Sequence, residues 1–286
     1  GGVFKITEGF VEKFGKGRVR NTPITESSIL GAGYGLSIAK QKAVVEMQFS
    51  DFVTCGFNQI VNNLAKSHYR WGQIADVVVR MPTGAGVQAG PFHSQSTEAW
   101  FYHTPGLKIY YPSNPYDAKG LLLRALEDPN PVLFFEHKLL YRSISGAVPE
   151  SPYLIEEGKA VVHHHGDDVC IITYGWGVHK ALECIQANQF KGRVVDLRTL
   201  LPWDKETVLE QVKATGKVLV LTEDTLTGSI ASDIAAWISE HGFEHLDAPV
   251  QRLGSLDTPV PLAKTLEDHF LPWDRLKNTL DRLIAY

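Results

Sequence analysis

The chain has 286 residues, of which 44% are hydrophobic and 21% are charged, a composition typical of a globular protein long enough for two domains. Its formal net charge of -4 excludes the strongly basic surface that nucleic acids and anionic membranes require. No apolar run approaches the roughly 20 residues that span a bilayer, so we expect neither a nucleic acid nor a membrane as partner.

The three cysteines, Cys55, Cys170 and Cys184, are odd in number and share no CxxC spacing. This pattern argues against a disulfide framework and against a zinc site. The opening segment GGVFKITEGF lacks the basic start and the apolar stretch of a signal peptide. We therefore expect a cytoplasmic location, or the mitochondrial matrix in a eukaryote.

Short apolar runs alternate with longer amphipathic segments along the first half of the chain. The apolar runs predict strands at 43–49, 75–81, 107–112 and 131–136. The amphipathic segments predict helices at 56–70 and 114–128, and Asn114 and Pro115 suit the cap and first turn of the second helix. This alternation predicts an α/β fold with a mostly parallel sheet.

A segment rich in Ser, Pro, Gly and Glu, SISGAVPESPYLIEEG, follows without periodicity and indicates an interdomain linker. We place the first domain at 1–142, the linker at 143–160 and the second domain at 161–286. In the second domain the alternation resumes. It predicts strands at 168–176, 192–200, 217–224 and 248–255, and helices at 178–188, 205–216 and 228–242.

Three conspicuous segments lack the spacing of a nucleotide or metal site. GAGYGLS (31–37) departs from the GxGxxG of dinucleotide sites, and no GK[ST] follows PTGAGVQAG (82–90). The triplet HHH (163–165) is predicted to be solvated at a strand end, because three adjacent residues rarely converge on one metal ion.

Glu26 follows the extended segment TPIT and directly precedes an apolar helix of small residues. One interpretation is an acid at a helix N-terminus, which the helix dipole stabilises by about 0.3–1 kcal/mol. The other is a partly buried carboxyl at a strand-to-helix junction, whose pKa is raised so that it exchanges protons. The pattern alone leaves both open.

His93 lies in the glycine-rich stretch MPTGAGVQAGPFHSQSTEAW (81–100). A loop histidine is ordinarily solvated, which is the simplest interpretation. The glycines, however, let the backbone approach a ligand, and the polar HSQS could anchor the imidazole. Phe49 and Phe52, in MQFSDF, are predicted to be core or the wall of a site.

Six segments occur in order along the chain: TPITESSI, VEMQFSDF with NQIVNNLAKSHYR, GPFHSQSTEAWFYHTPGLK, NPYDAKGLLLRALEDPNPVLFFEHKLLYR, VVDLRTLLPWD and RLGSLDTPVPLAKTLEDHFLP. Together they resemble the beta subunit of the thiamine diphosphate-dependent 2-oxoacid dehydrogenases, and FFEHKLLYR is closer to the branched-chain branch than to the pyruvate branch. The resemblance covers essentially the whole chain. It implies a pyrimidine-binding domain with a mostly parallel sheet, followed by a transketolase C-terminal-type α/β domain.

The resemblance also implies roles for individual residues. Glu26 matches the glutamate that hydrogen-bonds the cofactor's aminopyrimidine and so helps to activate the thiazolium ring. His93 matches a channel histidine suited to donate a proton during acyl transfer to a lipoyl disulfide. Phe52 matches an aromatic residue that stacks on the pyrimidine, with Ile24 and Gln48 beside it.

Asp128 and Asn130, in EDPNP, match positions that help to hold a structural potassium ion in some members of the family. Hard oxygen ligands of this kind suit an alkali cation. The alternative is a simple loop cap. The remaining ligands of the ion would be backbone carbonyls at Ala75, Val77, Val78 and Ala125.

The cofactor implied is thiamine diphosphate, with Mg²⁺ held by a GDG...N motif of an alpha-type partner. This chain contains no GDG, in agreement with a beta-type role. The expected partners are an alpha subunit or fused alpha domain, a second beta copy in an alpha2beta2-like assembly, and the lipoyl acyltransferase core through its subunit-binding domain. Because the chain starts on two glycines, we also expect that a strand and a helix of the family's first domain precede it.

Two other functions are compatible with parts of the pattern. A non-catalytic docking or assembly subunit would share the second domain, but it would need neither Glu26 nor His93. A fragment of a related transketolase or deoxyxylulose phosphate synthase is disfavoured, because those enzymes hold the diphosphate-binding domain in the same polypeptide. The 2-oxo acid itself stays open, since one methylene in an apolar pocket discriminates by only about 1–3 kcal/mol.

Overall fold

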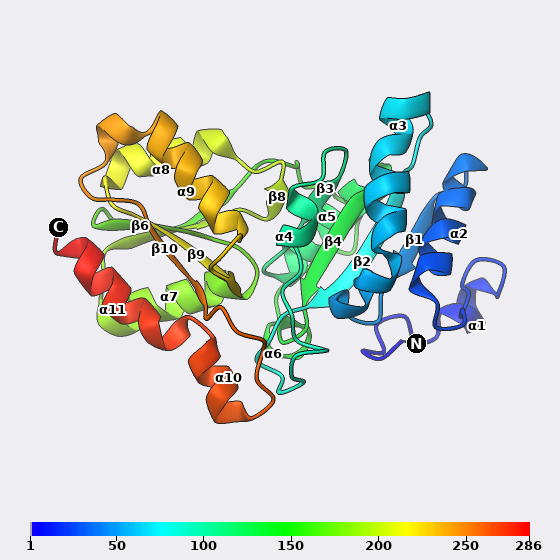
Figure 1. Cartoon of the computed structure of the whole chain (residues 1–286), viewed down its shortest axis with the longest axis horizontal. Helices are drawn as coiled ribbons and strands as arrows, with labels where there is room; N and C mark the ends of the chain where they lie inside the picture. Colours follow the sequence, from blue (N-terminus) through cyan, green and yellow to red (C-terminus); the bar gives the residue numbers. More distant parts are fainter. Residues whose placement is uncertain (1) are drawn as a thin grey trace.

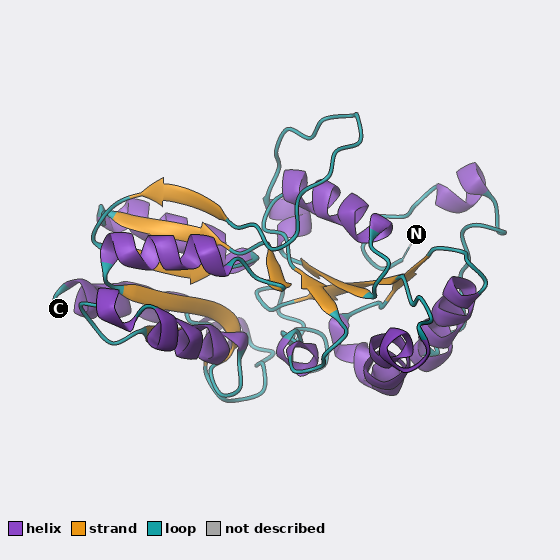
Figure 2. Ribbon diagram, turned by 90° about the horizontal axis from the view of Figure 1, so that it is seen from above, coloured by secondary structure: helices purple, strands orange, loops and turns teal. Residues whose placement is uncertain are grey.

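The computed structural model describes residues 2–286, which form two mostly parallel sheets side by side, each covered by helices (Figures 1 and 2). The first sheet contains β1 (Ala43–Glu46), β2 (Val77–Thr83), β3 (Lys108–Tyr110), β4 (Val132–His137) and β8 (Thr199–Leu201). Its strand order is β1-β2-β4-β3-β8, and only β8 runs antiparallel to its neighbour.

The second sheet contains β5 (Val161–His165), β6 (Val169–Thr173), β7 (Gly192–Asp196), β9 (Val218–Thr225) and β10 (Gln251–Ser255). Its order is β10-β9-β6-β7-β5, with β5 as the antiparallel edge strand. The two sheets confirm the predicted α/β fold with mostly parallel strands. Burial of both faces explains why β2 and β6 are continuous apolar runs, since helices cover parallel sheets on each side.

Helices and turns of the first half are α1 (Phe10–Phe14), α2 (Glu26–Ile38), η1 (Ser50–Gly56), η2 (Gln59–Leu64), α3 (Ala65–Trp71), α4 (Ala99–Tyr102), α5 (Pro115–Glu127) and α6 (Leu140–Ser143). Those of the second half are α7 (Trp176–Asn188), α8 (Lys205–Thr215), α9 (Ile230–His241), η3 (Phe243–His245), α10 (Lys264–Phe270) and α11 (Trp273–Ile284). None of the helices in residues 2–286 is both long and apolar enough to span a bilayer.

The predicted caps are present. The Asn114 side chain accepts a hydrogen bond from the Asp117 backbone N–H at 2.9 Å, and Pro115 is the first residue of α5. Gly216 ends α8 with a φ of 65°, the left-handed conformation that favours glycine. Local sequence signals therefore determine where these helices begin and end.

The predicted helix at 56–70 is helical from 57 to 71, with a π-helical turn inside it. A 3₁₀ turn, η1, and a π-helical turn, η2, precede the short α3. The cause of the tight start is close packing: a Cβ atom on Gly56 would lie 2.3 Å from the Leu30 side chain of α2. The chain therefore turns where it touches α2 before it continues as a helix.

The predicted strand at 192–200 is divided. β7 ends at Asp196, Arg198 adopts a left-handed φ of 59°, and β8 then pairs with β3 of the first sheet. A strand from the second half of the sequence thus completes the edge of the first sheet. The two domains are joined by backbone hydrogen bonds as well as by side chains.

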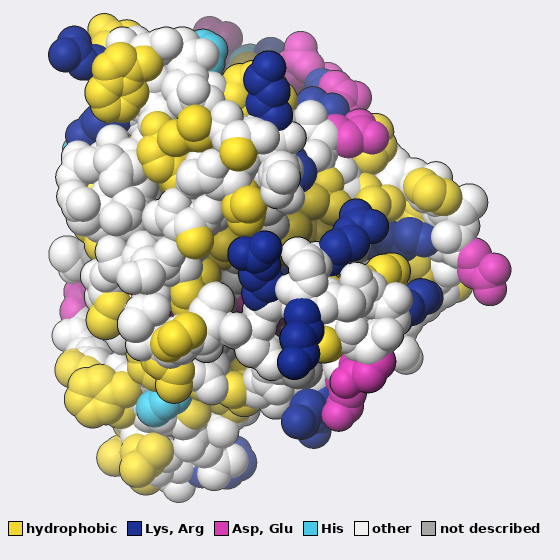
Figure 3. All heavy atoms as spheres, turned by 90° about the vertical axis from the view of Figure 1, so that its right-hand side faces the viewer, with side chains coloured by type: hydrophobic (Ala, Val, Ile, Leu, Met, Phe, Trp, Pro, Cys, Tyr) yellow, Lys and Arg dark blue, Asp and Glu magenta, His cyan; other side chains and the backbone are white. Residues whose placement is uncertain are grey.

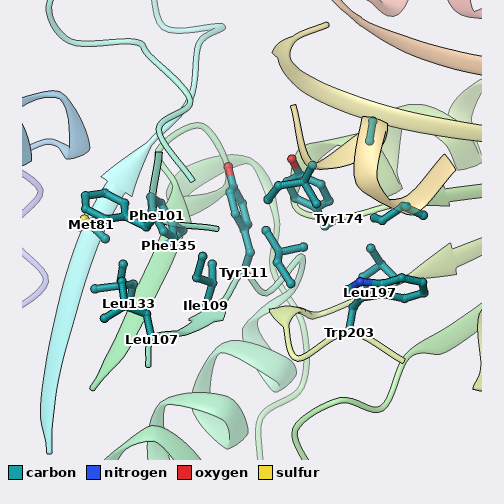
Figure 4. Packing of buried hydrophobic residues seen from close by; sticks show 14 of the residues in the cluster. Met81, Phe101, Leu107, Ile109, Tyr111, Leu133, Phe135, Tyr174, Leu197 and Trp203 are labelled. Atoms are coloured by element: carbon teal, nitrogen blue, oxygen red, sulfur yellow. The ribbon is translucent and has the colours of Figure 1, made fainter. Parts of the chain in front are cut away.

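One large apolar cluster extends through both domains (Figure 4). The Tyr111 ring stacks on Phe135 with a centroid distance of 5.9 Å and meets Tyr174 of the second domain at 5.2 Å. Trp203 and Leu197 continue the cluster on the same side. Because large buried aromatic rings dominate core energetics, this continuity resists separation of the domains.

Residues 144–160 contain no helix or strand, as the linker prediction expected of its composition. The segment is nevertheless packed against the first domain. Tyr153 stacks on Tyr116 at 4.5 Å, and Glu157 accepts hydrogen bonds from Lys108 and Tyr110. This linker is an ordered connection with fixed contacts.

The three histidines at 163–165 belong to β5 and its bulge at the sheet edge. His164 and His165 are exposed, and the half-buried His163 lies 3.9 Å from Asp196. The Asp196 carboxylate, whose effect outweighs burial, raises the pKa of His163. The structure thus agrees with the prediction of strand-end histidines.

Candidate active site

The candidate site lies at the carboxyl edge of the first sheet. Loops that follow adjacent parallel strands meet at this edge, which is where α/β proteins ordinarily bind ligands. Phe49 and Phe52 follow β1, and the loop of residues 84–98, here called the glycine-rich loop, follows β2 and includes His93. Parallel pairing of β1 with β2 therefore brings the two segments together.

The His93 ring is held by two phenyl rings. It meets Phe49 at a centroid distance of 5.0 Å and Phe52 at 5.4 Å, both nearly perpendicular, and the two phenyl rings are 5.7 Å apart. Edge-to-face contacts of this kind fix ring orientation without consuming either imidazole nitrogen. The half-buried His93 is therefore oriented by its aromatic neighbours.

Glu26 is the first residue of α2 and is half-buried. Its backbone lies 3.4 Å from the Cβ position of Gly56, so the start of α2 touches η1, which also contains Phe52. Ile24 is 82% exposed and Gln48 is exposed. The structure thus brings Phe52 and His93 into contact, places Glu26 on the helix that adjoins them, and leaves Ile24 and Gln48 on the surface.

The glycine-rich loop is also fastened to η1, which the sequence did not reveal. Asp51 Oδ1 accepts hydrogen bonds from the Gln95 backbone N–H at 3.1 Å and from its amide at 2.9 Å. Ser50 and Thr83 hydroxyls donate to the Gln95 carbonyl. The sequence feature that could have indicated this attachment is the polar pair Ser-Asp between two phenylalanines. Such a pair is unusual in a segment that is buried.

An ion chain crosses the first sheet below the site. Arg80 of β2 bonds Glu46 of β1 at 2.9 Å and Glu136 of β4 at 2.6 Å, and the Tyr141 hydroxyl also donates to Glu136. Burial raises the pKa of Glu136 even though Arg80 opposes the shift. The sequence signal was a lone arginine in the apolar strand VVVRM. This chain of charges ties together the three strands that present the site.

Asp128 and Asn130 lie at the other end of the first sheet. Asp128 Oδ2 is 2.6 Å from Lys108 Nζ, while its Oδ1 accepts both N–H groups of Asn130. Lys42 Nζ donates to the Asp128 carbonyl at 2.6 Å. Although burial alone would raise it, the pKa of Asp128 is lowered, because Lys108 and Asn130 stabilise the carboxylate.

The backbone carbonyls proposed as further potassium ligands are close by. The Ala75 and Ala125 carbonyls accept the backbone N–H groups of Val77 and Asp128, and Val78 pairs with Val132 in the sheet. Every side-chain oxygen of Asp128 already has an N–H or ammonium partner. These bonds are those of a loop cap, and the potassium site stays a prediction.

Comparison with known proteins agrees with this geometry. Residues 1–143 match the transketolase pyrimidine binding domain, and residues 158–275 match the transketolase C-terminal domain. The 2-oxoisovalerate dehydrogenase subunit beta of Bacillus subtilis is 50% identical over 95% of this chain and 85% of its own length. The chain belongs to the 2-oxoacid dehydrogenase beta-subunit family.

Other members of this family act on different donors. A beta subunit of acetoin:2,6-dichlorophenolindophenol oxidoreductase from Cupriavidus necator is 42% identical over 95% of this chain and 81% of its own length. Among solved structures, an inactive beta4 tetramer of a split-gene transketolase has a TM-score of 0.78 at 23% identity, covering 98% of this chain and 88% of that one. The latter likeness supports the fold.

The residues of this beta-family chain fit one half of thiamine diphosphate. Phe49 and Phe52 form an apolar wall for a flat ring, and Glu26 supplies a carboxyl on the adjoining helix. Within residues 2–286 no group of three or more His, Cys, Asp or Glu side chains is placed to hold a metal ion. The chain thus contains residues suited to the pyrimidine.

Proposed function

We propose that this chain is the beta half of an active site that decarboxylates a branched-chain 2-oxo acid on thiamine diphosphate and passes the acyl group to a lipoyl group of an acyltransferase. The observation that carries the proposal is the contact of His93 with Phe49 and Phe52 at the carboxyl edge of the first sheet. Family membership supports the chemistry, and the 2-oxoisovalerate relative supports a branched-chain acid. An assembly subunit would have no use for an oriented histidine.

Thiamine diphosphate, when bound, supplies the carbanion chemistry that breaks the bond between the carboxylate and the 2-oxo carbon. Glu26 would hold the aminopyrimidine by a hydrogen bond from its carboxyl. Phe52 would stack on the same ring, with Ile24 and Gln48 at its margin. The chain's own contribution to this step is to orient the ring and to exchange a proton with it at the Glu26 carboxyl.

His93 acts in the second half of the reaction. As the lipoyl disulfide opens, one sulfur forms the bond to the acyl carbon and the other must receive a proton. A histidine titrates near neutral pH and can deliver that proton, a contribution that is typically worth about 10²- to 10⁴-fold in rate. The two phenyl rings fix the orientation of the imidazole to which the lipoyl group would come.

The proposed partners follow from what the chain leaves exposed. Ile24 at 82%, Tyr69 at 93% and Phe92 at 72% exposure are large apolar side chains at the surface, and Figure 3 shows hydrophobic side chains spread over the face of the N-terminal elements. Such surfaces mark protein contacts. We infer an alpha-type subunit or fused domain that holds Mg²⁺ and the diphosphate, a second beta copy, and docking to the acyltransferase core.

The proposed compartment is cytoplasmic. Cys55, Cys170 and Cys184 are all free, which suits reducing conditions.

The proposal is tested by assaying decarboxylation of 3-methyl-2-oxobutanoate with thiamine diphosphate and Mg²⁺, using this chain alone, the alpha partner alone and the mixture. Activity only in the mixture is expected. Acetoin is assayed in parallel, because a relative of this chain acts on acetoin. Turnover of acetoin without turnover of the oxo acid would replace the substrate, and inactivity on both in a correctly assembled mixture would contradict the proposal.

Glu26→Gln tests the role of the carboxyl in the assembled enzyme. The substitution keeps size and helix position but removes the exchangeable proton, so a loss of decarboxylation of about 10²-fold or more is expected. Glu127→Gln, at the exposed end of α5, is the matched control and should leave the rate unchanged. Near-normal turnover by Glu26→Gln would contradict the proposed role of Glu26. It would not bear on the role of His93, which is tested separately.

A further inference from the structure

The glycine-rich loop is fastened to the second domain by two carboxylates. Glu267 of α10 accepts the Gly86 backbone N–H at 3.0 Å and the Gln88 backbone N–H at 3.1 Å. Glu223 of β9 accepts the Ala85 backbone N–H at 2.7 Å. Three of the four successive N–H groups from 85 to 88 are thus held by side chains that lie more than 130 residues further along the chain.

The Ala85–Glu223 bond is buried, and the two bonds to Glu267 are partly buried. Glu267 and Ala85 are each 1% exposed, and Ala85 packs with Val260 and Phe270 of the second domain. A Cβ atom on Gly86, whose φ is 81°, would lie 2.9 Å from the Trp176 ring. The start of the loop is therefore inserted into the second domain, at an approach that only glycine permits.

Loop flexibility explains why such anchors are needed. Gly84, Gly86 and Gly90 all have positive φ, and so does Gln88, at 56°. Glycines accept many conformations, so this segment would sample them freely without fixed partners for its N–H groups. The loop then turns from the Gly90 carbonyl to the His93 N–H at 3.3 Å, so the anchored residues determine where the imidazole is presented.

We propose that Glu267 and Glu223 are positioning residues for His93, so that the second domain sets the geometry of acyl transfer and does more than dock partners. The inference rests on the proposed role of His93 as proton donor. Misplacement of a catalytic group by about 1 Å can cost on the order of 10²-fold in rate, so loss of an anchor should be felt at this step. Decarboxylation depends on Glu26 and the cofactor ring, which these anchors do not touch.

The test uses the full chain assembled with its alpha partner, and it measures two reactions. Reductive acylation of lipoamide requires the His93 step, whereas reduction of 2,6-dichlorophenolindophenol takes electrons without the lipoyl group. Glu267→Ala is expected to lower kcat for lipoamide by about 10- to 100-fold and to change the dye reaction by less than about 2-fold. Glu267→Gln keeps one acceptor oxygen and should show a smaller loss. Asp268→Asn, the exposed neighbour on α10, is the matched control with no loss.

Amide hydrogen exchange gives a readout without turnover. Deuterium uptake over residues 85–93 should rise in Glu267→Ala and stay unchanged in Asp268→Asn, while the rest of the chain keeps its protection. In the His93→Ala background, Glu267→Ala should cause no further loss of lipoamide acylation, because its effect acts through the imidazole.

Several results would overturn the inference. An equal loss in both reactions would mark Glu267 as a general structural residue, and no loss in either would show that the anchor is dispensable. A further loss in the His93→Ala background would mean that Glu267 acts by another route. If His93→Ala alone left lipoamide acylation intact, the proposed function of His93 would fail first, and the inference with it.

Discussion

Two glutamates buried between the domains differ in the partners that surround them. Glu223 Oε1 accepts the Ala85 N–H at 2.7 Å, and its Oε2 lies 2.6 Å from His137 Nε2. Glu98 accepts the Tyr174 hydroxyl at 2.8 Å, and its Oε2 has no hydrogen-bond partner in the described part of the chain. Both side chains are buried, at 7% and 1% exposure, so the comparison shows how neighbouring donors and charges act on a buried acid.

The hydrogen-bond donors around each glutamate determine whether its carboxyl group is charged. Burial raises the pKa of Glu223, but His137, the Ala85 N–H and Lys138 outweigh it, so the pKa is lowered and the carboxylate stays ionised. At Glu98 burial acts in the same direction as the charge of Asp224, which raises the pKa to about 8. Burial alone therefore does not predict the state of an acid, and the partners supplied by distant segments do.

The same substitution at both sites should give the largest contrast. Glu223→Gln leaves one acceptor oxygen where the carboxylate has two, and removes the charge opposite His137. A loss of about 2–4 kcal/mol in the free energy of unfolding is expected, or a thermal midpoint lower by roughly 5–10 °C. Glu98→Gln replaces a neutral acid by a neutral amide, so at pH 6 it should change stability by less than about 1 kcal/mol.

Thermal unfolding of the assembled protein measures both variants in one buffer. Glu240→Gln, on the exposed end of α9, serves as the surface control. Equal losses at Glu223 and Glu98 would refute the view that donors and not burial distinguish the two sites.

Raising the pH should reduce the stability that depends on the protonated form of Glu98. The folded chain keeps a proton on Glu98 up to about pH 8, whereas the unfolded chain releases it near the ordinary value of 4.5. The folded state binds more protons in this window, so its stability falls as pH rises through it, by about 1 kcal/mol per pH unit. Glu98→Gln should flatten this slope between pH 5 and 8. A slope identical to that of the unsubstituted chain would place the proton elsewhere.

Lowering the pH should reduce the stability that depends on the ionised form of Glu223. Because the pKa of Glu223 is lowered in the folded chain, its contribution is complete above 4.5 and is lost as pH falls through the lowered value. We expect a loss of about 1 kcal/mol per pH unit as the pH falls from 4.5 toward the lowered value. Unfolding midpoints at pH 5, 4 and 3.5 measure the loss, and Glu223→Gln, less stable throughout, should fall less steeply. Parallel curves would contradict the assignment.

The fold was largely predictable because its signals are local. Apolar runs predicted the positions of β2, β4, β6 and β9, and the caps Asn114 and Gly216 marked helix ends. One element was not predicted correctly. The crossing of β8 to the first sheet depends on a left-handed Arg198 and on pairing with β3. It is decided by segments far away in the sequence, which no local pattern reports.

The candidate site likewise contains residues that the sequence indicates and residues that only the fold reveals. His93, Phe52 and Glu26 could be selected from the sequence by their segments and by resemblance to a family, and the structure brings His93 and Phe52 into contact. Glu267 was missed because its partners lie about 180 residues away, at separations of 181 and 179. An acid in an otherwise amphipathic helix is ordinary, so nothing marked it as buried. Residues that touch a ligand can be recognised by type, whereas residues that position them require the fold.

The smallest predicted effect tests whether donors matter only where water is excluded. On α11, Lys277 Nζ lies 2.5 Å from Asp281 Oδ2, a contact as short as those of Glu223, but the two side chains are 53% and 42% exposed. Water solvates both charges when the pair is broken, so Asp281→Asn should cost only about 0.3 kcal/mol. Measured beside Glu223→Gln, a tenfold smaller loss is expected from a bond of equal length. If the two losses were similar, distance alone would set the value of such a contact, and the distinction between Glu223 and Glu98 would lose its physical basis.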